Sequence, residues 1–399
     1  MTVRVNKPAV NLREELADLR KPTGIAGEAM LRAETPQEQF NLIGAGRRNM
    51  IINGAMQVSQ RGTSLTGLTG TTFLLDRFKF SNSSHGAWTL SQDTNAPAGF
   101  SKSMKMLCTS ADSSVGANDY SFFIYKLEGN EVQQLASGTS RAKSMTLSFW
   151  VKSNVSGTYS VNFRNEDNAR QCGEAYTVDN TDAWEYKTVT IPPDTVSGYT
   201  DDNALSLQVE WWLGAGSTFS GGTLPTSWKT SSNSDRAGAN TVDVGTLTNG
   251  YFQITGVQLE LGKVATPFEH RSYGEELAAC QRYLYAINAG GHPSSTSAPY
   301  ARFISFAQGT NATIWFPSYP VQMRALPSLI ANNVSSSTLE MFNYNAQVSA
   351  SLSGISQAEG TTTTGQVVFS STSGISAGDT VSVRWNNNPN ASFQFDAEL

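Results

Sequence analysis

The side chains that most often carry catalysis are few and scattered in this sequence. The three histidines, His85, His270 and His292, have no partner that their spacing would bring beside them. The sequence contains neither an HExxH motif nor a G-x-S-x-G elbow, so zinc-protease and α/β-hydrolase chemistry lack support. Gly44-Ala45-Gly46 follows a helical pattern rather than a strand and lacks the third glycine of a dinucleotide loop. The sequence therefore nominates no catalytic residue and predicts no cofactor.

Acidic residues and their amides raise two further possibilities. Asn165-Glu166-Asp167-Asn168 and Asp201-Asp202-Asn203 could each hold calcium through oxygen ligands, but neither has the spacing of a calcium loop, and solvated turns are favoured. A glycosidase needs two carboxylates held within a cleft. With 33 Asp and Glu residues in the chain, spacing alone selects no such pair. A polysaccharide depolymerase therefore stays as an alternative hypothesis without named residues.

Aromatic residues are the remaining functional signal, at 10% of the chain with eight tryptophans. In Phe149-Trp150 and in Trp211-Trp212 the two neighbours point to opposite faces of a strand, so one can be core while the other reaches the outer face. Sugars bind aromatic rings through their apolar C–H faces, with hydrogen bonds from Asn, Gln and Asp. Packing in the core or at a subunit interface is the alternative for each ring. The predicted glycan-binding residues are Trp150, Trp212, Tyr300, Trp315 and Tyr344.

Length and composition limit the kind of protein that presents these residues. The 399 residues suggest two or three domains, and 15% charged residues with 34 glycines suit short strands joined by tight turns. The balance of 28 basic and 33 acidic residues gives a net charge of −5, which argues against a nucleic-acid partner. Without a run of 18 apolar residues, no membrane insertion is expected. Met1-Thr-Val-Arg-Val lacks the apolar core of a signal peptide, so Sec-type export is not expected.

The cysteines support neither a metal site nor a disulfide framework. Cys108, Cys172 and Cys280 are far apart and odd in number, and no CxxC pair occurs. We therefore predict three buried or half-buried thiols. This usage is typical of a protein assembled in a reducing compartment.

Residues 1–48 are predicted to form short helices. Asn11 can cap a helix over Leu12–Arg20, and Thr35-Pro36-Gln37-Glu38 is a capping box for a second helix that Gly44 ends. Helices this short cannot bury a core alone. We expect them to dock on another subunit; packing on the adjacent domain of the same chain is the alternative. The predicted attachment residues are Leu12, Leu16, Leu19 and Phe40.

Residues 49–272 and 293–399 both have the pattern of β-domains. Alternating apolar residues bounded by turn signals predict a central jelly-roll-like β-sandwich, with a Ser/Thr/Gly-rich surface loop over 214–249. A linking helix, Gly274–Ile287, is predicted within 273–292, followed by a smaller C-terminal β-sandwich. The predicted strands are Met145–Val151, Tyr159–Phe163, Trp184–Ile191, Leu205–Trp211, Tyr300–Ala307, Thr313–Phe316, Ser328–Ala331, Gln366–Ser371, Thr380–Trp385 and Ala391–Phe395.

Two segments at the ends of the central domain resemble a known family. One is Asn49-Met-Ile-Ile-Asn-Gly-Ala-Met-Gln-Val58 with Gln60-Arg61-Gly62-Thr63, and the other is Ile254–Tyr273, a strand with a bulge predicted at Gly256. They are similar to the start and end of the β-sandwich module in tail-fibre and related virion proteins of bacteriophages, especially cyanophages. Asn11–Arg48 resembles leaders found ahead of this module, and Phe316–Pro327 and Phe395–Leu399 are typical of the last domain.

The resemblance implies a structural virion protein, usually a homotrimer when it is a tail fibre, with a module similar to carbohydrate-binding jelly rolls. It supplies no catalytic residues. We therefore expect a non-enzymatic tail fibre, assembled in the host cytoplasm and located in the virion tail. Its N-terminus would attach to tail adaptor or nozzle proteins, and the protein would bind a host cell-surface polysaccharide. A capsid knob or tail connector without a receptor role is the second hypothesis, because 399 residues leave no room for a long shaft.

Overall fold

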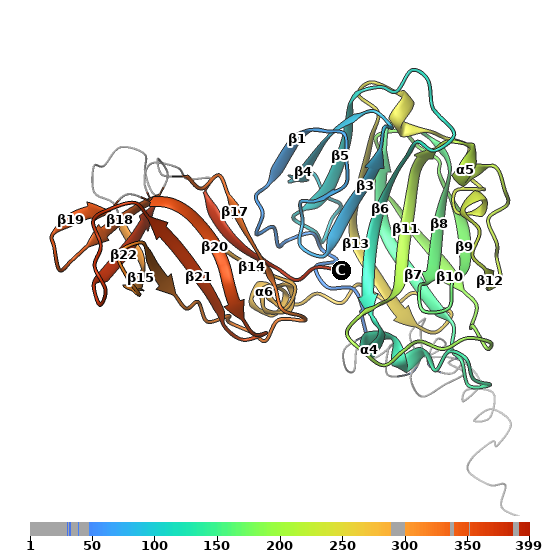
Figure 1. Cartoon of the computed structure of the whole chain (residues 1–399). Helices are drawn as coiled ribbons and strands as arrows, with labels where there is room; N and C mark the ends of the chain where they lie inside the picture. The colour runs from blue at the N-terminus through green and yellow to red at the C-terminus, as the bar shows by residue number, and fades with distance from the viewer. Residues whose placement is uncertain are drawn as a thin grey trace, which may run out of the picture.

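The computed structural model describes residues 48–288, 300–335, 339–350, 352–385 and 391–399, together with Met30, Arg32 and Gln39. The predicted N-terminal helices, with Leu12, Leu16, Leu19 and Phe40, lie outside these residues. The protein is mainly β, as predicted, and its strands form a large and a smaller body side by side (Figure 1).

The large body is a sandwich of two antiparallel sheets, between which the chain passes repeatedly in the manner of a jelly roll (Figure 1). Sheet A contains, in spatial order, β1 (Ser64–Leu68), β4 (Ala87–Asp93), β5 (Ser103–Ser110), β13 (Tyr251–Leu261), β7 (Met145–Ser153) and β10 (Glu185–Ile191). Sheet B contains β12 (Lys229–Thr230), β9 (Arg170–Val178), β8 (Gly157–Asn165), β11 (Leu205–Ala215), β6 (Tyr120–Glu128), β3 (Phe78–Ser83) and β2 (Thr72–Phe73).

The sandwich core follows from strict alternation along its strands. Phe149 of β7 and Trp211 of β11 point inward from opposite sheets, fully buried, with ring centroids 5.9 Å apart. Their neighbours Trp150 and Trp212 point outward, as the sequence predicts. Short helical turns lie in the connections: α4 (Gly129–Val132), η1 (Gln133–Leu135), α5 (Ser217–Ser220), η2 (Asn233–Asp235) and η3 (Val244–Thr246).

The smaller body contains two further antiparallel sheets. Sheet C consists of β14 (Leu284–Asn288), β23 (Ser392–Asp396) and β17 (Ser328–Asn332). Sheet D consists of β19 (Val348–Ala350), β18 (Leu339–Asn343), β22 (Thr380–Trp385), β15 (Tyr300–Ala307), β16 (Ala312–Trp315), β21 (Gly365–Ser371) and β20 (Leu352–Gly360). Its core is rich in aromatic rings, including Phe303, Phe369, Phe393 and Phe395.

The predicted linking helix is only partly correct. Helix α6 (Tyr273–Gln281) begins with a capping box between Ser272 and Glu275, but it ends six residues before Ile287. Leu284–Asn288 instead forms strand β14, which pairs along its length with β23. The apolar run Leu284-Tyr285-Ala286-Ile287 fits either structure by its pattern alone, and pairing with the distant C-terminal strand decides it.

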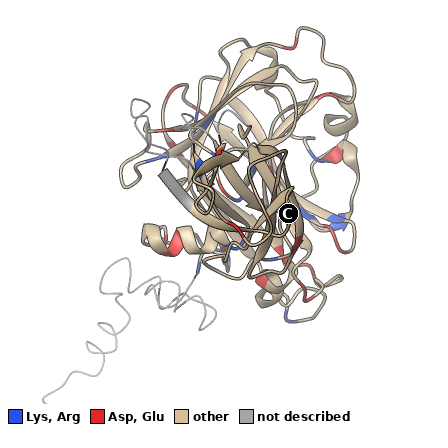
Figure 2. Cartoon of the chain, turned by 60° about the vertical axis from the view of Figure 1, so that its left-hand side comes forward, with Lys and Arg blue, Asp and Glu red and all other residues tan. Residues whose placement is uncertain are grey.

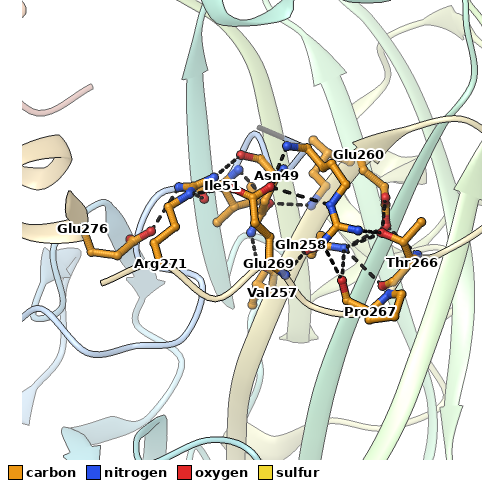
Figure 3. A network of polar contacts seen from close by, with 12 residues as sticks. Asn49, Ile51, Val257, Gln258, Glu260, Thr266, Pro267, Glu269, Arg271 and Glu276 are labelled. Atoms are coloured by element: carbon orange, nitrogen blue, oxygen red, sulfur yellow. Dashed lines mark hydrogen bonds and ion pairs between the residues drawn. The ribbon is translucent and has the colours of Figure 1, made fainter. Parts of the chain in front are cut away.

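The two segments that carry the family resemblance meet in space (Figure 3). The Glu269 carboxylate accepts hydrogen bonds from the backbone N–H groups of Arg48, at 2.6 Å, and Asn49, at 2.8 Å. Arg271 donates from Nη2 to the Asn49 carbonyl at 2.6 Å and from Nη1 to Glu276 Oε1 at 3.0 Å. Burial raises the pKa of Glu269, but these N–H donors and Arg271 outweigh it and leave the pKa below its usual value. The network fastens the beginning of the sandwich to its end.

A second set of ion pairs joins the sandwich to the smaller body. Arg61 lies 2.8 Å from Asp396, and Arg77 lies 2.9 Å from Glu398. The Arg77 guanidinium is buried 3.3 Å from the centre of the Tyr283 ring. The C-terminal residues therefore hold the smaller body against the sandwich.

The buried thiols agree with the sequence-based expectation, since Cys108, Cys172 and Cys280 are all free and buried. Within the described residues, no helix is long and apolar enough to span a bilayer. Charged positions are sparse along the ribbon, with acidic and basic residues interspersed (Figure 2).

Candidate functional site

A group of partly exposed aromatic side chains lies on the outer face of sheet A. Trp150 of β7 and Tyr186 of β10 are direct cross-strand partners, with ring centroids 5.4 Å apart and planes inclined at 51°. Tyr186 is 44% exposed, and Trp150 is half-buried. Aromatic rings of a sandwich usually turn into the core, so two neighbouring rings on the outer face form an accessible apolar surface.

Trp184 and Asn95 extend this surface. Trp184 precedes Tyr186 by two residues and so lies on the same face of the β10 segment. Its indole Nε1 donates a 2.9 Å hydrogen bond to Asn95 Oδ1, which also accepts from Lys152 Nζ at 3.4 Å. The Asn95 side chain is exposed, and both of these hydrogen bonds use its Oδ1 atom. Its amide N–H groups have no partner among the described residues.

Phe100 borders the surface because a glycine allows its close approach. Gly256 has φ +62°, and a Cβ at this position would lie 2.7 Å from the Phe100 ring and 3.1 Å from Trp150 Cδ1. The register of β13 with β7 shifts at this point, which confirms the bulge predicted at Gly256. Phe268 and His270 support Phe100 from the other side, at ring distances of 5.0 and 5.3 Å.

We call Phe100, Trp150, Trp184, Tyr186 and Asn95 the aromatic surface. Its rings offer apolar contact area, and the Asn95 amide and neighbouring Lys152 offer hydrogen-bond donors. A few polar groups set among aromatic rings can orient a ligand that combines C–H faces with hydroxyl groups. The residues predicted from the sequence include Trp150 but not Trp184 or Tyr186. The alternation of the Trp184–Ile191 segment contains this signal, since Trp184 and Tyr186 share one face.

The prediction that Trp212 binds a glycan is wrong for this structure, because its side chain is 0% exposed. It points outward from sheet B, but it stacks on Phe122 at 4.3 Å and packs against Phe219 at 5.5 Å. The Arg236 guanidinium lies 4.8 Å from its ring and pairs with the buried Glu210 at 2.6 Å. The loop predicted over 214–249 therefore does more than connect strands, since Phe219 and Arg236 belong to it and cover this face.

The three remaining predicted residues lie in the smaller body, away from the aromatic surface. Trp315 is half-buried and stacks on Phe303 of the core at 4.2 Å, so packing accounts for much of its ring. Tyr344 is 42% exposed, and Arg384 Nη2 donates to its hydroxyl at 3.4 Å. The backbone of Tyr300 begins β15, whereas its side chain lies outside the described residues.

A Ser-His-Asp arrangement at one end of the sandwich was not apparent from the sequence. His85 Nδ1 lies 2.9 Å from Ser121 Oγ, and His85 Nε2 lies 3.0 Å from Asp243 Oδ1. Ser121 and His85 are both 0% exposed, so a substrate cannot reach the hydroxyl. Asp243 also caps the short helix η3 through the N–H of Gly245. This geometry fits a buried polar brace better than a nucleophilic site, which needs an accessible hydroxyl.

The described residues include no group of three or more His, Cys, Asp or Glu side chains placed to hold a metal ion. The Asn165–Asn168 segment is used within the fold, since Asn165 and Asn168 both donate to the Gly198 carbonyl. Neither observation favours a metal site there.

Comparison with known proteins finds no matching family model and no matching curated protein. Among solved structures, the chain is similar to the enzymatically active domain of tailspike protein 4 of bacteriophage CBA120, with 13% identity and a TM-score of 0.28 over 53% of this chain. The chain spans about a fifth of that structure, covering 21% of its length.

Carbohydrate-binding modules are also among the similar structures. The tandem CBM22-1–CBM22-2 domain of Xyn10C from Paenibacillus barcinonensis has 11% identity and a TM-score of 0.27, covering 89% of this chain and 99% of that one. A CBM4 structure has 15% identity and a TM-score of 0.22, covering 44% and 88%. Scores this low carry no functional argument, which has to come from the site itself.

Proposed function

We propose that the protein binds a glycan through the aromatic surface and performs no catalysis there. The observation that carries this proposal is the outward-facing pair of half-buried Trp150 and 44% exposed Tyr186, extended by half-buried Trp184 on the same sheet face. The pair presents ring area to solvent, while the Asn95 amide and Lys152 provide donors for hydroxyl oxygens. Ser121, the serine of the Ser-His-Asp arrangement found among the described residues, is fully buried. Its hydroxyl is therefore inaccessible to a substrate, and this arrangement does not favour hydrolysis.

Replacing Trp150 tests the proposal. We expect Trp150→Ala to weaken binding on an array of bacterial polysaccharides by about tenfold or more, because ring contacts supply much of the interaction. The matched control is Tyr273→Ala, which removes an exposed ring on α6 that makes no side-chain hydrogen bond among the described residues. Thermal unfolding of both variants checks that the fold is retained. Unchanged binding by folded Trp150→Ala protein would refute the assignment of this surface.

We further propose that the protein is a tail fibre of a bacteriophage, located in the virion tail and attached through residues 1–48 to adaptor or nozzle proteins. The family resemblance at Asn49–Thr63 and Ile254–Tyr273 supports this role, and hydrogen bonds of Asn49 to Glu269 and Arg271 join the two segments. Immunogold labelling of particles should place the protein on the tail. Normal incorporation of a variant lacking residues 1–48 would argue against N-terminal attachment.

We also propose that copies of the chain associate through the outer face of sheet D, as a homotrimer. Ile304 and Phe306 are 54% and 60% exposed on β15, and Phe342 lies on the same face. Glu340 and Arg384 are cross-strand partners beside this apolar area, so the face offers both charges to a second copy. Sedimentation should detect an oligomer that Ile304→Ser with Phe306→Ser dissociates, whereas Leu247→Ser, at an exposed site of the sandwich, should leave it intact. Several copies would also strengthen weak glycan binding.

A further inference from the structure

Two lysines lie on the same sheet face as the aromatic surface. Lys152 of β7 and Lys105 of β5 are both cross-strand partners of Gln253 on β13, which separates them. Neighbouring strands lie about 4.8 Å apart, so the two lysines are about 10 Å apart across the sheet. Trp184 continues this row beyond Lys152, because the next residue, Glu185, pairs with Val151. The row therefore consists of a ring, a cation, the buried amide of Gln253 and a second cation in succession.

Neither lysine is neutralised by a carboxylate within the described chain. Lys152 Nζ contacts the neutral Asn95 Oδ1 at 3.4 Å, and Lys105 Nζ lies 4.8 Å from the centre of the Tyr251 ring. Most arginines of the sandwich behave differently, since they pair with carboxylates, as Arg170 does with Asp194 at 2.8 Å. Two half-buried cations without acidic partners on one face are thus available to an anionic ligand.

The acidic groups near this row make hydrogen bonds to groups other than the two lysines. Asp93 Oδ1 accepts a 2.8 Å hydrogen bond from the backbone N–H of Asn95, and Asp182 Oδ1 accepts from the Tyr251 hydroxyl. Glu260 is fully buried, where it accepts from the backbone N–H and the hydroxyl of Thr266. The neutral donors leave Asp93 and Asp182 charged, but neither of them nor Glu260 pairs with Lys105 or Lys152. The two lysines therefore have no carboxylate partner among the described residues, although the chain as a whole carries −5.

We infer that the glycan bound by this surface is an acidic polysaccharide, whose carboxylate groups contact Lys152 and Lys105 while sugar rings pack on Trp150 and Tyr186. This inference rests on the proposed glycan binding at the aromatic surface and specifies its ligand class. The two lysines favour a ligand with anionic groups. The ring pair on the adjacent row, Trp150 and Tyr186, favours a ligand with C–H faces. The regular spacing of the two cations suits a polymer that lies across the strands and carries acidic groups at intervals.

The test uses the full chain and each polysaccharide in two forms. Polygalacturonate and a panel of uronate-containing bacterial capsular polysaccharides are immobilised in native form and after carboxyl reduction, which converts their uronates to neutral sugars. We expect about tenfold tighter binding of the native forms, weakened by salt. The variant Lys105→Gln with Lys152→Gln should abolish this preference, so that it binds the native and reduced forms about equally. The control, Arg141→Gln with Lys143→Gln, removes two positive charges from exposed residues before β7. This control should still bind the native forms more tightly than the reduced forms.

The possible outcomes separate this inference from the proposed function. Equal binding of native and reduced forms, lost in Trp150→Ala, would overturn the acidic ligand class but keep glycan binding. Absence of binding to any polysaccharide in either form would overturn both. Equally tight binding of inorganic polyphosphate that Trp150→Ala leaves unchanged would mean that charge alone is recognised, and would also overturn the inference.

Discussion

Asp76 is a fully buried carboxylate near the contact between the sandwich and the smaller body. It accepts hydrogen bonds from Gln60, through the backbone N–H at 2.9 Å and through Nε2 at 2.5 Å. Gln60 Nε2 also donates to the Leu284 carbonyl at 2.6 Å, so the contact reaches strand β14. Burial raises the pKa of Asp76 from 3.8 to about 6, although Arg61 and Gln60 act in the opposite direction.

This raised pKa predicts that the contribution of Asp76 to the free energy of unfolding decreases as the pH rises. Between pH 4 and 6 the folded protein keeps a proton on Asp76 that the unfolded chain has released, so the free energy of unfolding falls through this range. A rise in pKa from 3.8 to about 6 corresponds to about 3 kcal/mol at neutral pH. Asp76→Asn should therefore be more stable, relative to wild type, at pH 7.5 than at pH 4.5. Urea denaturation at both pH values measures the difference, and an equal effect of the substitution at both would contradict the prediction.

Trp150 and Trp212 show what residue patterns can and cannot predict. Each follows a core aromatic residue, and alternation correctly places both on the outer faces of their sheets. Their exposure differs because Phe219 and Arg236 cover Trp212, whereas the segment beside Trp150 leaves part of its ring open. The position of such a covering loop depends on tertiary contacts that alternation does not encode. The same limit explains why the Ser121–His85–Asp243 contact, across 158 residues for His85 and Asp243, could not be found by spacing.

At the scale of elements, the bulge in β13 controls the shape of the aromatic surface. Gly256 adopts a positive φ, and any side chain there would meet the Phe100 ring at 2.7 Å. Gly256→Ala should destabilise the fold by about 1–3 kcal/mol, since both backbone strain and a collision oppose it. It should also weaken glycan binding, because Phe100 would move away from its place beside Trp150. Chemical denaturation and the polysaccharide array measure the two effects.

Gly274→Ala provides the matched control for this substitution. Gly274 lies in the first turn of α6, has no positive φ, and a Cβ there would meet nothing within 4 Å. The alanine should stabilise the helix by about 0.4–1 kcal/mol and leave glycan binding unchanged. A Gly256→Ala protein that matched Gly274→Ala in both measurements would show that the bulge does not constrain the surface.

Strands and helices could be predicted from the sequence where the local residue pattern agreed with the strand pairing in the fold. Strands β15 and β22 match their predicted ranges, because apolar alternation and turn residues set both ends. Strand β20, Leu352–Gly360, was not predicted, since its Ser- and Gly-rich composition resembles a loop and it depends on pairing with β21. The predicted end of helix α6 was wrong for a similar reason, because the residues after the helix form a strand of sheet C.

For the whole molecule, the arrangement of the two bodies depends on a few buried charges. Arg77 donates from Nη1 to Glu398 Oε2 at 2.9 Å and from Nη2 to the Lys126 carbonyl at 2.6 Å, with its guanidinium beside the Tyr283 ring. Arg282 adds a 2.7 Å contact to the buried Glu128. These residues come from distant parts of the sequence, which is why composition and motifs predicted two β-bodies but not how they would be joined.

Removing the Arg77 guanidinium should release the smaller body from the sandwich. Arg77→Met keeps much of the side-chain volume but removes the guanidinium partner of Glu398, which retains the backbone N–H at position 77, at 3.0 Å, and the 3.5 Å contact to Arg61. Breaking a buried pair in this way costs about 3–5 kcal/mol. Hydrogen exchange should accelerate in β14 and β23 while protection of β7 and β13 is retained, and small-angle scattering should show a larger radius of gyration. Glu398→Gln serves as a milder second variant if Arg77→Met does not fold. Arg384→Met is the control, since Arg384 lies over Phe342 at 4.3 Å within the smaller body and makes no described contact with the sandwich. Equal exchange in β14 and β23 for all three variants and the wild type would mean that contacts other than the Arg77–Glu398 pair hold the two bodies together.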